Sequence, residues 1–234
     1  MVKQILITGA NRGIGLELTR QLLARGQRVL ATCRQPDQAA ALQNLTNQFG
    51  DRLLILPLNV SDDVSVREAK TAVNNTVDHL DMLINNAGIL VKGETLSNFD
   101  AANMQRSLNV NAVGVMRVVT QFIDLLRLGH DPKVINISSQ LGSLQKMRPQ
   151  WGRYSYNSSK AALNMVSRML SFDLQEDGIA LAVLHPGWVQ TDMGGAHAAV
   201  TPHASAAGIL QIADNLTLAN TGKFYTFAGE EHPW

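Results

Sequence analysis

Short apolar runs alternate with longer helical stretches along almost the whole chain, and this alternation restricts the fold more than any other feature. The runs expected to be strands are residues 3–8, 28–33, 53–58, 81–85, 133–138, 179–184 and 223–227. They lack a regular alternation of apolar and polar residues, as expected of strands that are covered on both faces. Helices between successive strands require right-handed crossovers between parallel strands. The sequence therefore predicts an α/β fold with a doubly wound parallel sheet of about seven strands.

Helical periodicity fills the segments between these runs. The expected helices span residues 13–25, 37–49, 62–79, 100–128, 155–176 and 204–218. Asp62 and Asp100 each stand directly before a helical stretch, and we expect both to be N-caps. Neither a long linker rich in Pro, Gly or Ser nor an internal repeat interrupts this pattern, so we predict one domain over residues 1–234.

The composition excludes several classes of partner. The chain has a formal net charge of +1 and no run of basic residues, so binding to nucleic acid or to an anionic membrane has no electrostatic support. No apolar run has the length of a membrane span. The six histidines show no metal-ligand spacing, and we expect no metal. The single Cys33 cannot form an internal disulfide, and residues 1–10 do not resemble a leader, which together predict a cytoplasmic protein.

The turn after the first expected strand reads TGANRGIG and is a candidate phosphate-binding loop. Gly9, Gly13 and Gly15 allow the backbone to turn sharply and to approach a phosphate without a Cβ in the way. The helix that follows presents free N–H groups and the positive end of its dipole. A glycine-rich turn alone is a weak signal, but a place between a strand and a helix is the one required of a dinucleotide site.

The segment YSYNSSK at residues 154–160 places a phenol beside an ammonium. On a helix, Lys160 lies one turn after Tyr156 and roughly 40° around the axis, so the two side chains share a face. Tyr154 points elsewhere. A cation this close favours the phenolate, and it would lower the pKa of Tyr156 from about 10 toward the working range of an acid/base catalyst. The alternative is a Tyr–Lys pair on an exposed helix face.

Four segments occur in the order typical of one protein family. TGANRGIG at 8–15, NNAG at 85–88, Ser139 at the end of the fifth strand and YNSSK at 156–160 resemble the motifs of the short-chain dehydrogenase/reductase family. The resemblance covers essentially the whole chain, and SKAALNM, HPGWVQTDMGG and GEEHPW resemble the sniffer/C-factor-like carbonyl reductases within that family. It implies a single-domain Rossmann fold, a nicotinamide cofactor and reversible carbonyl–alcohol chemistry.

The end of the second strand is where the family binds the adenosine ribose. A carboxylate there favours NAD(H), whereas arginine favours the 2′-phosphate of NADP(H). This sequence has Cys33 where NAD-type members carry Asp, followed by Arg34; Asp37 lies beyond Pro36, and we expect it to cap the next helix. Arg12 in the glycine loop is a second cation for the same phosphate. With no acidic competitor, the two arginines favour NADP(H) over NAD(H); solvated surface arginines are the alternative.

The resemblance implies four catalytic residues: Asn111, Ser139, Tyr156 and Lys160. Tyr156 is the acid/base, Lys160 tunes it and binds the nicotinamide ribose, and the Ser139 hydroxyl steadies the substrate oxygen. Ser138 is the structural alternative to Ser139, and we expect it to support the backbone turn.

Asn111 takes a place on the apolar stripe of the helix expected over 100–128. The apolar members of this stripe are Met104, Leu108, Val115, Val118 and Phe122. A buried amide must find partners or cost stability. In the family this asparagine holds a water that connects the lysine to solvent, whereas a satisfied core asparagine is the alternative. Asn109 lies off the stripe and is the weaker candidate.

The resemblance also implies the contacts of the cofactor and candidates for the substrate pocket. The cofactor-binding residues are Gly9, Asn11, Arg12, Gly13, Ile14, Gly15, Arg34, Asn59, Val60, Asn86, Ala87, Gly88, Tyr156, Lys160, Pro186, Gly187, Val189 and Thr191. Asn59 stands where the family usually has an adenine-contacting Asp. The candidate substrate residues are Leu141, Trp151, Trp188 and Met193, for which core or loop packing is the alternative.

These features predict an NADPH-dependent oxidoreductase that reduces a small-molecule aldehyde, ketone or quinone to an alcohol. The alternative is an NADP(H)-binding sensor or signalling protein with little turnover, which would have no need of Tyr156. The short segment after Thr191 predicts an open pocket. Because family members assemble through the helices expected at 100–128 and 155–176, a homodimer or homotetramer is expected.

Overall fold

A computed structural model describes residues 1–148 and 153–234 of the chain. Its strands are β1 (Gln4–Thr8), β2 (Arg28–Cys33), β3 (Leu53–Pro57), β4 (Met82–Asn85), β5 (Lys133–Ile137), β6 (Ala180–His185) and β7 (Lys223–Thr226). Its α-helices are α1 (Gly13–Ala24), α2 (Ala40–Phe49), α3 (Asp63–Asn74), α4 (Ala101–Leu108), α5 (Gly114–Arg127), α6 (Tyr154–Glu176) and α7 (Pro202–Asn215).

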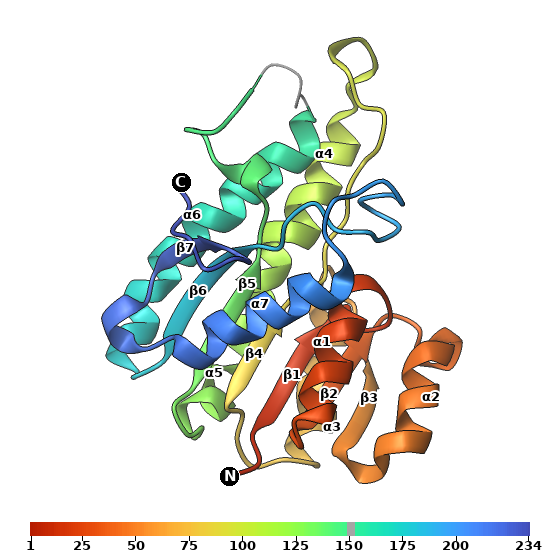
Figure 1. Ribbon diagram of the computed structural model, residues 1–234, viewed down its shortest axis with the longest axis vertical. Coiled ribbons are helices and arrows are strands. Elements are labelled where there is room, and N and C mark those ends of the chain that lie inside the picture. Colours follow the sequence, from red (N-terminus) through yellow and green to blue (C-terminus); the bar gives the residue numbers. More distant parts are fainter. Residues whose placement is uncertain (149–152) are drawn as a thin grey trace.

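The strands form one sheet in the order β3-β2-β1-β4-β5-β6-β7, and all neighbouring pairs are parallel (Figure 1). This confirms the predicted doubly wound parallel sheet. The strand order changes direction between β1 and β4. In open parallel sheets, ligands bind outside the carboxyl ends of the strands at such a switch point.

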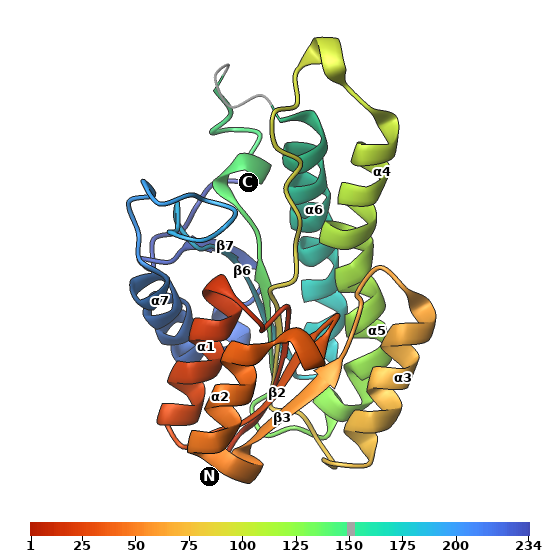
Figure 2. The same cartoon turned by 90° about the vertical axis from the view of Figure 1, so that its right-hand side faces the viewer.

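Helices cover both faces of the sheet and enclose two separate apolar cores (Figure 2). Helices α1, α2 and α7 pack on one face, and α3, α5 and α6 pack on the other. Ile5 and Ile7 of β1 belong to the first core, whereas Leu6 between them belongs to the second. Both faces of each strand are therefore apolar, which is why the sequence showed no regular alternation.

The helix starts follow the sequence except at one place. Asp62 caps α3 by accepting from the backbone nitrogens of Val64 (2.8 Å) and Ser65 (3.2 Å), and Asp100 caps α4, so both predicted N-caps are confirmed. The expected cap at Asp37 is wrong. Asp37 lies in a short 3₁₀ turn, and α2 begins after it without a side-chain cap.

The helix expected over 100–128 is interrupted by a π turn at Asn109–Val113, between α4 and α5. A π turn accommodates one more residue per turn than the α-helix, so it changes the angular relation between the helices on either side. The interruption places Asn111 at the switch point of the sheet, next to the segment that follows β4.

In the part of the chain that the structure describes, no helix combines the length and the apolar character needed to span a membrane.

Candidate active site and cofactor cleft

A cleft of about 1110 Å³ runs along the carboxyl ends of the strands. It brings together the predicted cofactor residues Gly9, Asn11, Arg12, Gly13, Ile14, Arg34, Asn59, Val60, Asn86, Ala87, Gly88, Tyr156, Lys160, Pro186 and Thr191. Gly15, Gly187 and Val189 are not among the described residues that line it. The residues come from the loop after β1, the first turn of α1, the segments after β2, β3, β4 and β6, and α6. A parallel sheet builds a site from distant segments in this way.

The glycine loop is held by the segment that follows β4. The Asn86 side-chain nitrogen donates to the carbonyl oxygens of Thr8 (3.0 Å) and Gly9 (2.9 Å), and the Thr8 hydroxyl accepts from the backbone nitrogens of Asn86 and Ala87. A Cβ on Gly15 would lie 2.5 Å from that Asn86 nitrogen. Gly15 is therefore required by packing within the loop, and the Asn86 amide positions the loop.

The start of α1 fits a phosphate. Arg12 precedes the helix in an extended conformation, and no side chain of the described residues caps the first turn. Arg12, Gly13 and Ile14 line the cleft, so the uncapped amides face it. Free amides and the positive end of the helix dipole form an anion site, as a dinucleotide requires.

Arginines line the outer end of the cleft, beside the glycine loop and the end of β2. One of them, Arg12, already has an acidic partner. Arg12 forms an ion pair with Asp192 (2.7 Å), in which the side chains are 65% and 74% exposed. The expectation of no acidic competitor is therefore wrong, because a loop distant in sequence brings a carboxylate to Arg12. Arg34 also lines the cleft, and no ion pair involves it among the described residues. Arg20, which the sequence did not single out, is a third cation of the lining and pairs with Glu17.

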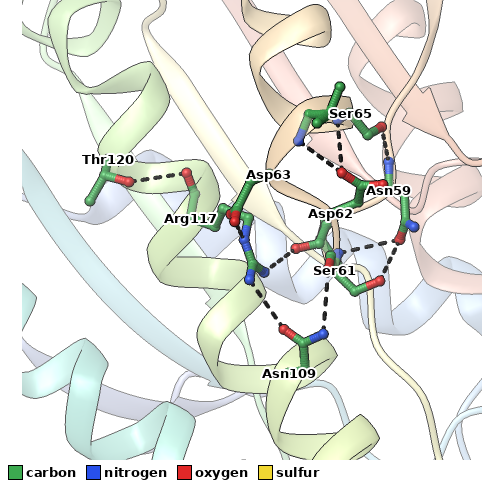
Figure 3. Close-up of polar contacts among 10 residues, drawn as sticks. Asn59, Ser61, Asp62, Asp63, Ser65, Asn109, Arg117 and Thr120 are labelled. Carbon is green, nitrogen blue, oxygen red and sulfur yellow. Dashed lines mark hydrogen bonds and ion pairs between the residues drawn. The ribbon is translucent and has the colours of Figure 1, made fainter.

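Asn59 lines the cleft with its amide oxygen already bound (Figure 3). This oxygen accepts from the Ser61 hydroxyl (2.8 Å) and the Ser61 backbone nitrogen (3.3 Å). The side-chain nitrogen is thus the atom that can reach a ligand. Asn59 presents a donor where an Asp would present an acceptor to the amino group of adenine.

Tyr156 and Lys160 lie together on α6, as their spacing predicted. Both are buried, with exposed fractions of 8% and 4%, so the alternative of an exposed surface pair is wrong. The Lys160 Nζ atom lies 5.9 Å from the centroid of the Tyr156 ring and donates to the Ile137 carbonyl oxygen at 2.9 Å. The end of β5 therefore fixes the ammonium beside the phenol.

The pKa of Tyr156 moves in the direction opposite to the expected one. Burial raises the pKa of the phenol, and the weaker effects of a hydrogen bond with Ser139 and of the Arg153 charge oppose it. Burial also lowers the pKa of Lys160 to about 8. The expected net lowering of the Tyr156 pKa is thus wrong, because the desolvation of a phenolate at this site outweighs the opposing effects of Ser139 and Arg153. At neutral pH the phenol keeps its proton and can donate it.

The two serines after β5 differ from expectation in which of them supports the backbone turn. The Ser139 hydroxyl oxygen accepts from the Leu141 backbone nitrogen (3.1 Å) and so supports the turn after the strand. The Ser138 hydroxyl donates to the side-chain oxygen of Asn164 (2.6 Å) and ties β5 to α6. The expectation that Ser138 supports the turn is therefore wrong. The Ser139 side chain also acts to lower the pKa of Tyr156, which places it close to the candidate acid.

Asn111 is fully buried and links three segments. Its side-chain oxygen accepts from the Ile89 backbone nitrogen (2.8 Å), and its side-chain nitrogen donates to the Ile89 carbonyl (2.9 Å) and to the Ser159 hydroxyl (2.8 Å). A Cβ built on Gly88 would lie 3.2 Å from the Asn111 side-chain oxygen and 3.7 Å from the Lys160 Nζ atom. Asn111 and Lys160 therefore border the same small space.

The candidate substrate residues separate in the structure. Met193 lines the cleft, whereas Leu141 and Trp188 are not among the lining residues described, and the Trp188 indole donates to the Gly194 carbonyl (2.8 Å). Trp151 lies outside the described residues. Lining residues that the sequence did not indicate include Gln38, Asn44, Ser61, Arg106 and Val110. They have no motif, and only the fold brings them to the cleft.

Comparison with known proteins agrees with this geometry. The sequence pattern of the short chain dehydrogenase family matches residues 3–200. The C-signal protein of Myxococcus xanthus is 40% identical over 163 residues, which cover 70% of this chain and 98% of that protein.

Two solved structures resemble the whole chain. The NADPH-bound carbonyl reductase from chicken fatty liver is 37% identical with a TM-score of 0.94, and the match covers 100% of this chain and 99% of the other. The carbonyl reductase Sniffer of D. melanogaster is 31% identical with a TM-score of 0.94 over 100% of both chains. From the matching sequence pattern, the sheet order and the cleft, the chain belongs to the short-chain dehydrogenase family of oxidoreductases.

Proposed function

We propose that the protein is an NADPH-dependent carbonyl reductase in which Tyr156 is the acid. The observation that supports this most is the geometry of the site: a buried phenol lies beside the Lys160 ammonium, with the Ser139 side chain close enough to affect the pKa of that phenol. Reduction of a carbonyl needs a proton donor for the forming alkoxide and donors that hold its oxygen. These residues supply both at the switch point of the sheet.

The reaction follows from the positions of these groups. Bound NADPH would supply the hydride to the carbonyl carbon. The hydroxyl groups of Ser139 and Tyr156 hold the carbonyl oxygen, and Tyr156 gives its proton to that oxygen as the alcohol forms. The negative charge left on the phenolate is stabilised by the Lys160 ammonium, since an opposite charge is strongly effective in a buried site. The phenol then regains a proton from solvent.

The preference for NADPH is supported at the outer end of the cleft. Arg34 lines the cleft and carries no acidic partner within the described part of the chain, and Cys33 replaces the carboxylate that would bind a free ribose hydroxyl. A 2′-phosphate also competes well for Arg12, because its ion pair with Asp192 is exposed and therefore weak. The related chicken liver structure is described as NADPH-bound.

A second candidate function is NADP(H)-dependent signalling with little turnover. It is favoured by the 40% identity to a protein named C-signal. The two proposals differ in their use of Tyr156, since only a reductase needs the phenol.

The test combines turnover with a matched pair of tyrosine variants. The purified protein is mixed with NADPH or NADH and a panel of aldehydes, ketones and quinones, and the loss of the reduced-cofactor absorbance is followed. Tyr156→Phe removes the proposed acid, whereas Tyr154→Phe removes an exposed hydroxyl two residues away.

We expect turnover with NADPH that Tyr156→Phe reduces about 1000-fold, as for loss of a general acid, and that Tyr154→Phe leaves unchanged. Tight NADPH binding without turnover of any compound would favour the signalling function. A preference for NADH would refute the role given to Arg34 and leave the reductase chemistry in place.

A further inference from the structure

We propose that Arg117 is a positioning residue that holds the adenine side of the cleft against the π turn that contains Asn111. This inference rests on the proposed function, since the adenine side has a role only if a dinucleotide binds. Arg117 lies on α5, belongs to no motif and is not itself part of the cleft lining among the described residues.

The Arg117 guanidinium makes three contacts, two with the stretch from the end of β3 to the start of α3 and one with the π turn (Figure 3). Its Nε atom donates to the Asp63 carboxylate at the start of α3. One terminal nitrogen donates to the Val60 carbonyl oxygen (2.7 Å), and the other donates to the Asn109 side-chain oxygen (3.2 Å). The Arg117 side chain is only 17% exposed, so its bonds to Val60 and Asn109 are partly shielded from solvent, whereas the Asp63 carboxylate is 66% exposed.

The first side of this bridge is the wall on which an adenine would lie. Asn59, Val60 and Ser61 line the cleft just after β3. A Cβ on Gly114 would lie 3.0 Å from both the carbonyl oxygen and a methyl group of Val60. The wall therefore packs directly on the first residue of α5, and Arg117, one turn later, fixes its carbonyl.

The second side is the π turn. Asn109, its first residue, accepts from Arg117 and donates to the Ser61 carbonyl at 3.4 Å. Asn111, two residues later, contacts Ile89 and Ser159 at the candidate catalytic centre. A π turn is an irregular element whose geometry depends on its neighbours. Arg117 therefore connects the adenine wall to Asn111 through a single rigid group.

Arginine suits this position because its planar fork presents several donors at fixed angles. Lysine at position 117 would carry the charge on one atom and could not hold Asp63, Val60 and Asn109 together. The consequence is that adenine binding and the placement of Asn111 share one support.

The test uses Arg117→Leu, Arg117→Lys and, as a matched control on the same helix, Arg127→Leu. Arg127 pairs with Asp124 and Asp177, and it is not among the described residues that line the cleft. The affinity for 2′-phospho-ADP-ribose, which lacks the nicotinamide, measures the adenine side without turnover. The rate of hydrogen–deuterium exchange at the Ile89 backbone amide, which donates to the Asn111 side-chain oxygen, measures the catalytic side. Thermal unfolding measures stability alone.

We expect Arg117→Leu to weaken binding of 2′-phospho-ADP-ribose about tenfold and to speed Ile89 exchange by a similar factor, as for the loss of charge-assisted hydrogen bonds. Arg117→Lys should bind the fragment more weakly than the wild type and exchange the Ile89 amide faster. Arg127→Leu should change neither the affinity nor the exchange rate. At saturating NADPH, kcat of Arg117→Leu should still be reduced, because the variant also loses the support of the π turn that contains Asn111.

A merely structural role would lower the unfolding temperature and change neither binding nor Ile89 exchange in the folded protein, and that result would overturn the proposal. A change in only one of the two would also overturn it, since the bridge must act on both sides. Because neither measurement needs a substrate, a wild type that binds the fragment but reduces no carbonyl refutes the proposed reaction and leaves the test of Arg117 decisive.

Discussion

The two ends of the cleft are built on different physical principles. At the catalytic end, Tyr156 and Lys160 are buried and bonded to interior groups. At the adenosine end, Arg12 and Asp192 form an ion pair in which both side chains are largely exposed. Interactions in a buried site are strong and are costly to leave unsatisfied, whereas exposed ion pairs contribute little. We therefore expect substitutions to have large effects on stability at the catalytic end and smaller effects, on cofactor binding, at the adenosine end.

The largest effect is expected for Asn111→Ala, which removes the partner of the buried Ser159 hydroxyl and of the partly buried backbone N–H and carbonyl of Ile89. Unpaired buried groups cost about 1 to 3 kcal/mol each, so we expect the free energy of unfolding to fall by about 4 kcal/mol. Denaturation in urea measures it. Asn109→Ala, only two residues away but at the adenosine end, should cost about 1 kcal/mol because its partners keep other contacts or water. Equal losses of unfolding free energy in the two variants would contradict the difference between the two ends of the cleft.

The next effect is a pH dependence of stability caused by Lys160. Burial lowers its pKa from 10.5 to about 8, which corresponds to about 3 kcal/mol of destabilisation while the lysine is charged. Between these pH values the unfolded chain binds more protons than the native one, so stability rises with pH. Relative to Lys160→Met, the wild type should therefore gain about 3 kcal/mol as the pH rises from below 8 to above 10.5.

Urea denaturation at a series of pH values gives this difference, and groups that titrate alike in both proteins cancel. A gap between the two proteins that does not change with pH would show that Lys160 is not desolvated.

A smaller effect is expected for Arg34→Ala at the exposed end. Loss of a charge-assisted contact to the 2′-phosphate should weaken NADPH binding about 10- to 100-fold. Binding of NADH, which lacks this phosphate, should be unchanged, and titration of both cofactors by fluorescence provides the measurement with its internal control. If NADH binding weakens as much as NADPH binding, Arg34 contacts another part of the cofactor or supports the fold.

The smallest effect is expected for Asp192→Asn. It removes the carboxylate that competes for Arg12, so NADPH should bind about threefold more tightly, in keeping with the low strength of exposed ion pairs. High salt should reduce the difference between the variant and the wild type. Weaker binding in the variant would mean that the ion pair positions Arg12 for the phosphate.

Most of the fold could be predicted from the sequence because the pattern is local. Each strand is a short apolar run, and the alternation with helices fixes a parallel sheet. The pair Tyr156 and Lys160 could be predicted from helix geometry, and the burial of Asn111 from its place on an apolar stripe. The π turn could not, since the stripe continues across it without a break.

The electrostatics of the site could not be predicted, because they depend on burial and on distant loops. The spacing of Tyr156 and Lys160 shows that they are neighbours, but only the fold shows that desolvation dominates the pKa of the phenol. Asp192 lies 180 positions from Arg12, and no local pattern brings them together. The hydrogen bonds from Ser61 to the Asn59 side-chain oxygen likewise depend on the fold of the loop after β3 and are marked by no motif.

The π turn at Asn109–Val113 limits how this part of the chain can change in length during evolution or engineering. Removing one of its residues would leave a continuous α-helix. Each helical residue turns the chain by about 100°, so such a deletion would rotate α4 by that angle relative to α5. Surface loops tolerate insertions and deletions readily. In these five residues, by contrast, the length of the segment sets the orientation of α4 relative to α5.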